Sequence, residues 1–84
     1  MSQIILIDVR SPEEYEDYHK ENAINLPVED IYHNTDTAKN ILNNINKKED
    51  TIHLYCASGS RAEMAKMILM NMGFEKVENL GGCY

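Results

Sequence analysis

The sequence predicts an α/β fold in which a parallel β-sheet is flanked by helices on both faces. Short apolar segments alternate along the chain with segments whose apolar residues recur at helical spacing. Elements in this order form parallel sheets whose ligands bind beyond the carboxyl ends of the strands. A loop of small residues headed by a cysteine follows one of the predicted strands, at such an end.

The N-terminal part of the chain predicts a strand and then a capped helix. Residues 3–8 form a continuous apolar run, which is typical of a strand buried on both faces. A helix is predicted over residues 12–19. Ser11 is a favoured N-cap, Pro12 suits the first helical position, and Glu14 is placed to complete a capping box.

Three further elements are predicted before and up to the cysteine. Residues 23–26 predict a brief second strand, which stops at Pro27 because proline has no N–H to donate to a ladder. Apolar residues recur at helical spacing within residues 35–48 while asparagines and lysines fill the other face, which predicts a surface helix. Residues 51–55 are β-branched and aromatic, as expected of the central strand, and stop at Cys56.

The C-terminal part of the chain predicts a longer helix and a last strand. The helix begins at Arg61, and Gly73 is well placed as its left-handed C-terminal residue. Its predicted buried stripe consists of Met64, Ala65, Ile68, Leu69 and Met72. The methionines of this helix are interpreted as core filler. Residues 74–80 predict the last short strand, centred on Val77.

Length and composition limit the classes of function. The 84 residues, 43% of them hydrophobic, predict a single domain over residues 1–84. The formal net charge of -6 opposes binding to nucleic acid or anionic membranes, and an anionic substrate therefore needs local donors. No apolar run approaches the roughly 18 residues of a membrane span. Two cysteines make no disulfide framework, so we expect a reducing compartment, the cytoplasm. The periplasm is the alternative if a signal peptide has been removed.

Cys56 heads a loop that suits a reactive thiolate. It stands between a predicted buried strand and a helix N-terminus, where unpaired N–H groups and the helix dipole favour an anionic sulfur. Gly59 lets the loop curl so that successive amides form an anion-binding nest, and Arg61 adds a positive charge at its mouth. Cys56 is the predicted catalytic residue. The predicted substrate-binding residues are Ala57, Ser58, Gly59, Ser60 and Arg61, and the two serines can add hydroxyl donors.

The loop and several other segments resemble the rhodanese family. Cys-Ala-Ser-Gly-Ser-Arg at residues 56–61 closely resembles the active-site loop of that family. Further similar segments follow in the family's order over nearly the whole chain. They lie at residues 6–10, 13–15, 23–27 and 77–82, together with His19. In its small size, the chain is most similar to the single-domain thiosulfate sulfurtransferases of the bacterial phage-shock type.

The resemblance implies a sulfur transfer in two steps. A donor such as thiosulfate leaves a sulfane sulfur on Cys56 as a persulfide, and this sulfur then passes to cyanide, a small thiol or a thiol-bearing protein. No metal or organic cofactor is implied. Two features depart from the family pattern: Asn22 stands where a glycine is usual, and the chain stops at Tyr84 where relatives often continue. Asparagine tolerates positive φ, so we expect the turn to survive.

Two other functions share parts of this pattern. Phosphatases and arsenate reductases also use a cysteine thiolate in an oxyanion loop that ends in arginine. Their familiar signature has five residues between the cysteine and the arginine, whereas four residues separate Cys56 from Arg61 in this chain. A binding or regulatory module that keeps the fold without catalysis is the other alternative, and the retained cysteine argues against it. A purely structural Cys56 would be a small buried residue at a strand end.

The remaining polar residues are interpreted as structural. Asp8 and Arg10 follow the first strand, and such a pair is more often local scaffolding than part of a site. The three histidines have no ligand spacing relative to the cysteines, so no metal site is predicted. Cys83 can act as a resolving thiol, but its place beside the C-terminus favours incidental exposure.

Overall fold

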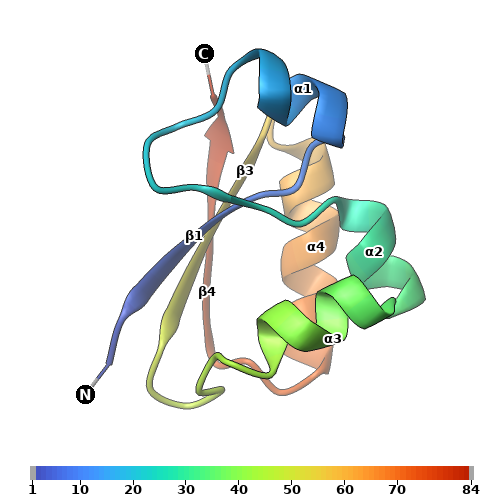
Figure 1. The fold of residues 1–84 in the computed structure, drawn as a ribbon. Coiled ribbons are helices and arrows are strands. Elements are labelled where there is room, and N and C mark those ends of the chain that lie inside the picture. The colour runs from blue at the N-terminus through green and yellow to red at the C-terminus, as the bar shows by residue number, and fades with distance from the viewer. Residues whose placement is uncertain (1, 84) are drawn as a thin grey trace.

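A four-stranded parallel sheet lies at the centre of the structure, a computed structural model that describes residues 2–83 (Figure 1). The strands are β1 (Ile4–Asp8), β2 (Ile24–Asn25), β3 (Thr51–Cys56) and β4 (Lys76–Gly82). The helices are α1 (Pro12–Asp17), α2 (Val28–His33), α3 (Asp36–Leu42) and α4 (Ser60–Asn71). Within residues 2–83, none of these helices has the length and apolar character needed to cross a membrane.

The strand order β2-β1-β3-β4 places the most apolar strands at the inner positions. Ile7 of β1 stands opposite Leu54 of β3 in the parallel register. Alternate side chains of these strands enter the core, where the fully buried residues include Ile7, Val9, Ile52, Leu54 and Cys56. The predictions of a parallel α/β sheet and of a central strand before Cys56 are confirmed. The carboxyl ends of the strands meet at the upper edge of the sheet in Figure 1.

The two faces of the sheet differ in helical cover. Helices α2, α3 and α4 gather on one face (Figure 1). Helix α1 lies at the carboxyl edge of the sheet. The Tyr18 carbonyl at the end of α1 accepts a hydrogen bond from Arg10. The Arg10 guanidinium in turn lies over the Tyr55 ring, on the face of the sheet opposite to α2, α3 and α4. Six residues of α1 span only about 9 Å, so this face is covered mainly at its carboxyl end. Ile4, at the amino end of β1, is 67% exposed.

The N-terminal helix and the turn after it follow the sequence closely. Ser11 Oγ accepts the N–H of Glu14 at 3.2 Å, and Glu14 Oε1 accepts the N–H of Ser11 at 3.1 Å. The predicted capping box is therefore confirmed. The helix ends slightly earlier than predicted, at Asp17. Asn22 has a φ of 70°, as expected for an asparagine that replaces a turn glycine.

The segment between β2 and β3 holds two short helices where one longer helix is predicted. The sequence does not predict helix α2, because six residues are too few to show a helical period of apolar side chains. Ile31 is the one buried residue of this helix. The helix predicted over residues 35–48 ends early, at Leu42. Beyond it, the Asn46 side chain accepts two backbone N–H groups and the Asp50 carboxylate accepts the N–H of Asn46. These side chains replace the hydrogen bonds of a continued helix.

The methionines of α4 contradict the prediction that they fill the core. Met64, Met67 and Met70 are each half or more exposed. The buried stripe of the helix is Ala62, Ala65 and Leu69, with Ile68 and Met72 at its margin. Apolar residues surround most of α4, so periodicity alone does not show which stripe faces the sheet. The small alanines let the helix approach the sheet closely, and the methionines remain outside.

Candidate active site

Cys56 ends β3, and the loop that follows wraps around its sulfur. The side chain is fully buried. Ala57, Ser58 and Gly59 make the turn, and α4 begins at Ser60. The N–H of Gly59 donates to Cys56 Sγ at 2.9 Å. The structure therefore brings the predicted loop together at the carboxyl edge of the sheet.

The loop favours the anionic form of Cys56. Burial raises the pKa of the Cys56 thiol, because a charged sulfur loses its contact with water. Backbone N–H groups oppose this effect, and they belong to Ala62, Ser58, Gly59 and Arg61. The hydrogen bonds outweigh burial, so the pKa lies below the ordinary value of a cysteine thiol. The predicted thiolate thus receives its stabilisation from the main chain of the loop and of the first turn of α4.

The serine hydroxyls of the loop lie at its exposed surface. Ser58 Oγ and Ser60 Oγ are 3.3 Å apart, and both side chains are exposed. The hydroxyls can donate to oxygen atoms of an incoming ligand. That role stays a prediction.

Asn79 of β4 ties the loop to the rest of the domain. Its Nδ2 donates to the Gly59 carbonyl and to Glu63 Oε1, each at 3.0 Å, and its Oδ1 accepts the N–H of Gly81 at 2.8 Å. Gly59 is therefore held from both sides, by Asn79 at its carbonyl and by Cys56 Sγ at its N–H. Sequence reasoning missed this residue. The only available signal was its place in the family-like segment over residues 77–82.

The glycines at the end of β4 let the strand pack directly against the loop. A Cβ on Gly82 would lie 2.4 Å from the Ala57 carbonyl oxygen, and one on Gly59 would lie 3.3 Å from the Gly81 Cα. Gly59 also has a φ of 101°, which side chains disfavour. The end of β4 is thus a rigid support for the cysteine loop.

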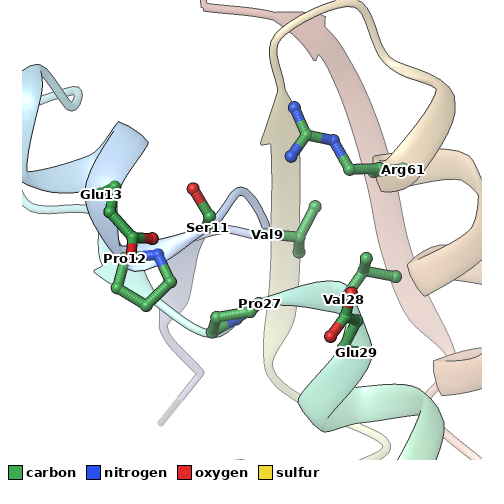
Figure 2. Close-up of a pocket in the computed structure, with 8 residues that line it drawn as sticks. All are labelled: Val9, Ser11, Pro12, Glu13, Pro27, Val28, Glu29 and Arg61. Carbon is green, nitrogen blue, oxygen red and sulfur yellow. The ribbon is translucent and has the colours of Figure 1, made fainter.

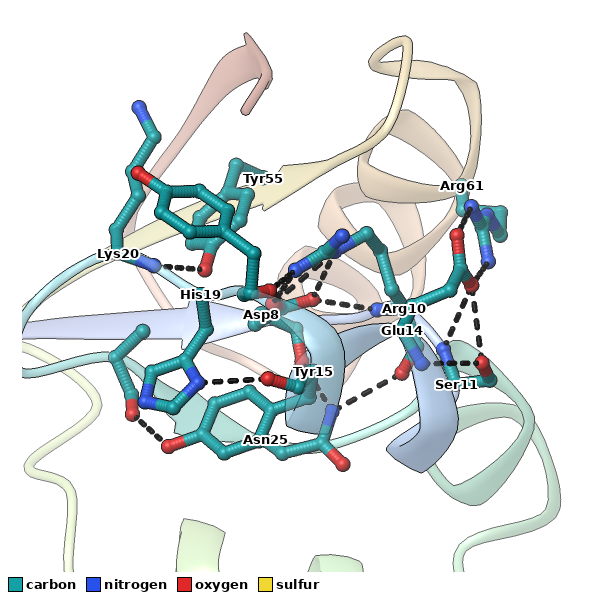
Figure 3. A network of polar contacts seen from close by, with 12 residues as sticks. Asp8, Arg10, Ser11, Glu14, Tyr15, His19, Lys20, Asn25, Tyr55 and Arg61 are labelled. Carbon is teal, nitrogen blue, oxygen red and sulfur yellow. Dashed lines mark hydrogen bonds and ion pairs between the residues drawn. The ribbon is translucent and has the colours of Figure 1, made fainter. Parts of the chain in front are cut away.

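Arg61 reaches the mouth of the loop but is already paired. Its guanidinium donates to both carboxylate oxygens of Glu14, at 2.7 and 3.0 Å (Figure 3). Glu14 is in turn held by the capping box of α1 through Ser11. The predicted positive charge is therefore present at the mouth and partly neutralised, and its role toward a substrate stays a prediction.

A cavity of about 280 Å³ opens beside Arg61 (Figure 2). The lining residues come from the end of β1 and the starts of α1, α2 and α4: Val9, Ser11, Pro12, Glu13, Pro27, Val28, Glu29 and Arg61. Arg61 is the one residue of the predicted loop in this lining, so the cavity lies beside the mouth of the cysteine loop.

Comparison with known proteins identifies the family of this loop and fold. Residues 1–84 match the family described as Rhodanese-like domain. The chain belongs to the rhodanese family. It is 41% identical over 76 residues to the thiosulfate sulfurtransferase PspE of Escherichia coli strain K12, which covers 90% of this chain and 67% of that protein.

Other relatives of this rhodanese differ in length and name. The chain is 33% identical over 78 residues to a probable molybdopterin-synthase adenylyltransferase of Porphyra purpurea, covering 93% of this chain but only 19% of that longer protein. A solved structure described as a rhodanese with anions from E. coli superposes with a TM-score of 0.79 at 38% identity, covering 94% of this chain and 86% of that one. The predicted rhodanese-like fold is confirmed.

The Asp8–Arg10 pair of this rhodanese is buried scaffolding, as predicted. The two side chains are 0% and 1% exposed, and Arg10 donates to both carboxylate oxygens of Asp8 (Figure 3). The pair also receives support from Asn25, whose Nδ2 donates to the carbonyls of both residues. These contacts fix the chain between β1 and α1, and hence the position of Glu14 beside Arg61.

Glu14 should make the stability of this rhodanese depend on pH. Its pKa is lowered to about 2, chiefly by the hydrogen bonds from Arg61. The contribution of the Glu14–Arg61 pair to the free energy of unfolding is fully present above about pH 4.3, the pKa of a glutamate in the unfolded chain. It is lost as the pH falls toward 2 and Glu14 becomes protonated. Both side chains are 36% exposed, so we expect at most about 1 kcal/mol.

Urea unfolding at about pH 6 and about pH 3 measures this contribution. Wild-type protein should lose more unfolding free energy between the two pH values than the Glu14→Gln variant does. Equal losses in the two proteins would show that the Glu14–Arg61 pair contributes nothing.

Cys83 is a free thiol just beyond β4. It is partly buried, and its neighbour Gly82 stands opposite Cys56 in the β3–β4 register. The sequence-based interpretation, incidental exposure near the C-terminus, remains a prediction for the mutational test below.

Proposed function

We propose that this rhodanese moves a sulfane sulfur from thiosulfate, or a similar donor, to a thiol or cyanide acceptor through a persulfide on Cys56. The cradle of N–H groups around the buried sulfur carries this proposal, with Gly59 N–H at 2.9 Å from Sγ. Such a cradle stabilises an anionic sulfur both as a thiolate and as the outer atom of a persulfide. The E. coli relative is named a thiosulfate sulfurtransferase, which supports the choice of donor.

Both steps are nucleophilic substitutions at sulfur. In the first, the Cys56 thiolate attacks the outer sulfur of thiosulfate; the new S–S bond forms as that of thiosulfate breaks, and sulfite leaves with its electron pair. In the second, an acceptor thiolate or cyanide attacks the outer sulfur of the persulfide. The electron pair of the broken bond returns to Cys56, and the acceptor leaves as a persulfide or thiocyanate. Neither step needs an external electron donor.

An assay with thiosulfate and cyanide tests the proposal. Pure protein should release thiocyanate well above the uncatalysed background. Protein treated with thiosulfate alone should gain the mass of one sulfur atom on the peptide that contains Cys56. If both signals are absent, the non-catalytic binding module takes the place of this proposal. Hydrolysis of p-nitrophenyl phosphate without thiocyanate release would instead favour a phosphatase.

Arg61→Ala is expected to raise the thiosulfate KM about three- to tenfold and to leave kcat nearly unchanged. A guanidinium at the loop mouth attracts the anionic donor equally before and during reaction, which affects KM alone. Glu14 shares the charge, so the effect is modest. Glu14→Gln should act in the opposite direction and lower KM. Steady-state kinetics decide, and an unchanged KM in Arg61→Ala would assign donor binding to the backbone amides alone.

We further propose that residues 1–84 work as one domain, without metal or organic cofactor, in a reducing compartment such as the cytoplasm. A single cluster of buried apolar residues links the sheet with α2, α3 and α4, which supports one cooperative unit. Both substitution steps use only Cys56 and the main chain of its loop. A free thiol of this kind stays reduced where disulfides are rare.

A further inference from the structure

Four large apolar side chains are exposed on the neighbouring helices α2 and α4. Met64, Met67 and Met70 of α4 are 52%, 61% and 50% exposed, and Tyr32 of α2 is 66% exposed. The two helices pack against each other, and Tyr32 and Met64 line the same cavity of about 330 Å³. We call these four residues the α2–α4 surface. Methionines at a protein surface adapt to apolar partners of varied shape.

The α2–α4 surface is continuous with the mouth of the cysteine loop. Its cavity is lined by Val28, Glu29, Tyr32 and Met64, whereas the cavity beside the loop includes Val28, Glu29 and Arg61. Val28 and Glu29 belong to both, and Figure 2 shows them below Arg61 at the start of α2. A ligand bound along these residues is therefore held next to the reacting loop.

The lining of these two cavities, which we call the acidic path, carries a negative charge. Glu13 and Glu29 are the carboxylates among the lining residues, and neither forms an ion pair within residues 2–83. Among the described residues that line the two cavities, Arg61 is the one cation, and Glu14 neutralises it. Two unpaired carboxylates beside apolar side chains complement a ligand that is both cationic and apolar.

We propose that the α2–α4 surface and its acidic path bind a cationic, apolar segment of an acceptor protein, whose cysteine takes the sulfur from Cys56. This inference rests on the proposed function and names the acceptor. Arg61 and Met67 are about 9 Å apart along the axis of α4. A small thiol at Cys56 does not extend past Arg61 to Met64 and Met67, whereas an extended peptide spans this distance with about three residues.

The transfer step keeps atoms and electrons balanced. The acceptor cysteine thiolate attacks the outer sulfur of the Cys56 persulfide, the bond between that sulfur and Cys56 breaks, and its electron pair returns to Cys56. The acceptor protein then carries the persulfide. No oxidant or reductant is consumed.

Protein loaded with thiosulfate and freed of excess donor is the starting material for the test. Two short peptides serve as acceptors, each with one cysteine and two leucines, one with lysines and the other with glutamates at the remaining positions. Mass spectrometry follows the loss of sulfur from Cys56. The lysine peptide should react about tenfold faster than the glutamate peptide at low ionic strength.

Matched variants separate this path from the overall charge of the protein. Glu13→Gln/Glu29→Gln should reduce the preference for the lysine peptide to less than about threefold. Glu49→Gln/Glu75→Gln makes the same change of net charge at exposed positions at the opposite end of β3 and β4, and should keep the preference. Loss of the preference in both double variants would overturn the proposal, because bulk charge would then explain it.

The apolar part of the surface is tested with Met64→Gln/Met67→Gln. This variant should slow transfer to the lysine peptide about fivefold or more and leave transfer to cyanide unchanged, since cyanide does not reach the methionines. Ile4→Gln, at a similarly exposed position on the far face, is the control and should change neither rate. Equal peptide rates in wild type, or equal slowing of peptide and cyanide, would refute the docking surface. Absence of thiocyanate from loaded wild type would instead refute the persulfide mechanism itself.

Discussion

Cys56→Ser is expected to abolish both sulfur loading and thiocyanate release. The serine hydroxyl is slightly smaller than the buried thiol and fits its site, but it stays protonated near neutral pH and cannot form a persulfide. Without the nucleophile, turnover should fall at least about a thousandfold, to the uncatalysed rate. Thiocyanate assays and the mass of the thiosulfate-treated peptide measure both effects.

Cys83→Ser is the matched control for this experiment. It removes the other thiol of the chain, which lies beyond β4 and outside the amide cradle, so both signals should remain largely intact. Turnover by the Cys56→Ser protein, or a sulfur that maps to Cys83, would show that the mechanism is wrong even though the family is right.

Asn79→Asp is expected to raise the pKa of Cys56 and to lower kcat/KM for thiosulfate by about tenfold or more. The aspartate keeps the acceptor for Gly81 but loses the two N–H donors to Gly59 and Glu63. Without that donor, the Gly59 carbonyl is released and the Gly59 N–H moves away from Sγ. Each unit by which the pKa rises above the assay pH lowers the thiolate fraction tenfold. The rate of alkylation by iodoacetamide as a function of pH reports the pKa directly.

Two further variants isolate the contact of Asn79 with the loop. Asn79→Ala removes the donors without adding a charge and should shift the alkylation profile in the same direction. Glu63→Gln leaves the bond from Asn79 to Gly59 in place and should keep the wild-type profile. An unchanged profile in both Asn79 variants would mean that the loop keeps its geometry without this residue.

The parts of the fold that were predictable carry their signals in adjacent residues. The capping box at Ser11, the apolar β1 and the β-branched β3 are local patterns, and each appears in the structure. Helix α2 is too short to show a period, and the early end of α3 depends on side-chain bonds around Asn46. The orientation of α4 depends on how closely Ala62 approaches the sheet, which is a property of packing rather than of pattern.

The same division holds for the site. The loop from Cys56 to Arg61 is contiguous, so the sequence alone indicates its chemistry. Its supports are not contiguous: Arg61 and Glu14 are 47 positions apart, and Asn79 and Gly59 are 20 apart. Spacing along the chain does not reveal such pairs until the sheet order brings the elements together. The structure therefore adds Glu14 and Asn79 to the residues that determine how the loop behaves.

The support that β4 gives to the loop links the reactivity of Cys56 to the docking of the C-terminal strand. Asn79 and Gly82 both belong to β4, so any opening that detaches this strand removes the contacts that fix the cysteine loop. Until β4 docks beside β3, the Gly59 carbonyl lacks its partner and the amides are not held toward the sulfur. We therefore expect Cys56 to reach its full reactivity only while β4 is docked. The alkylation rate of Cys56 is thus a local probe of whether β4 is in place.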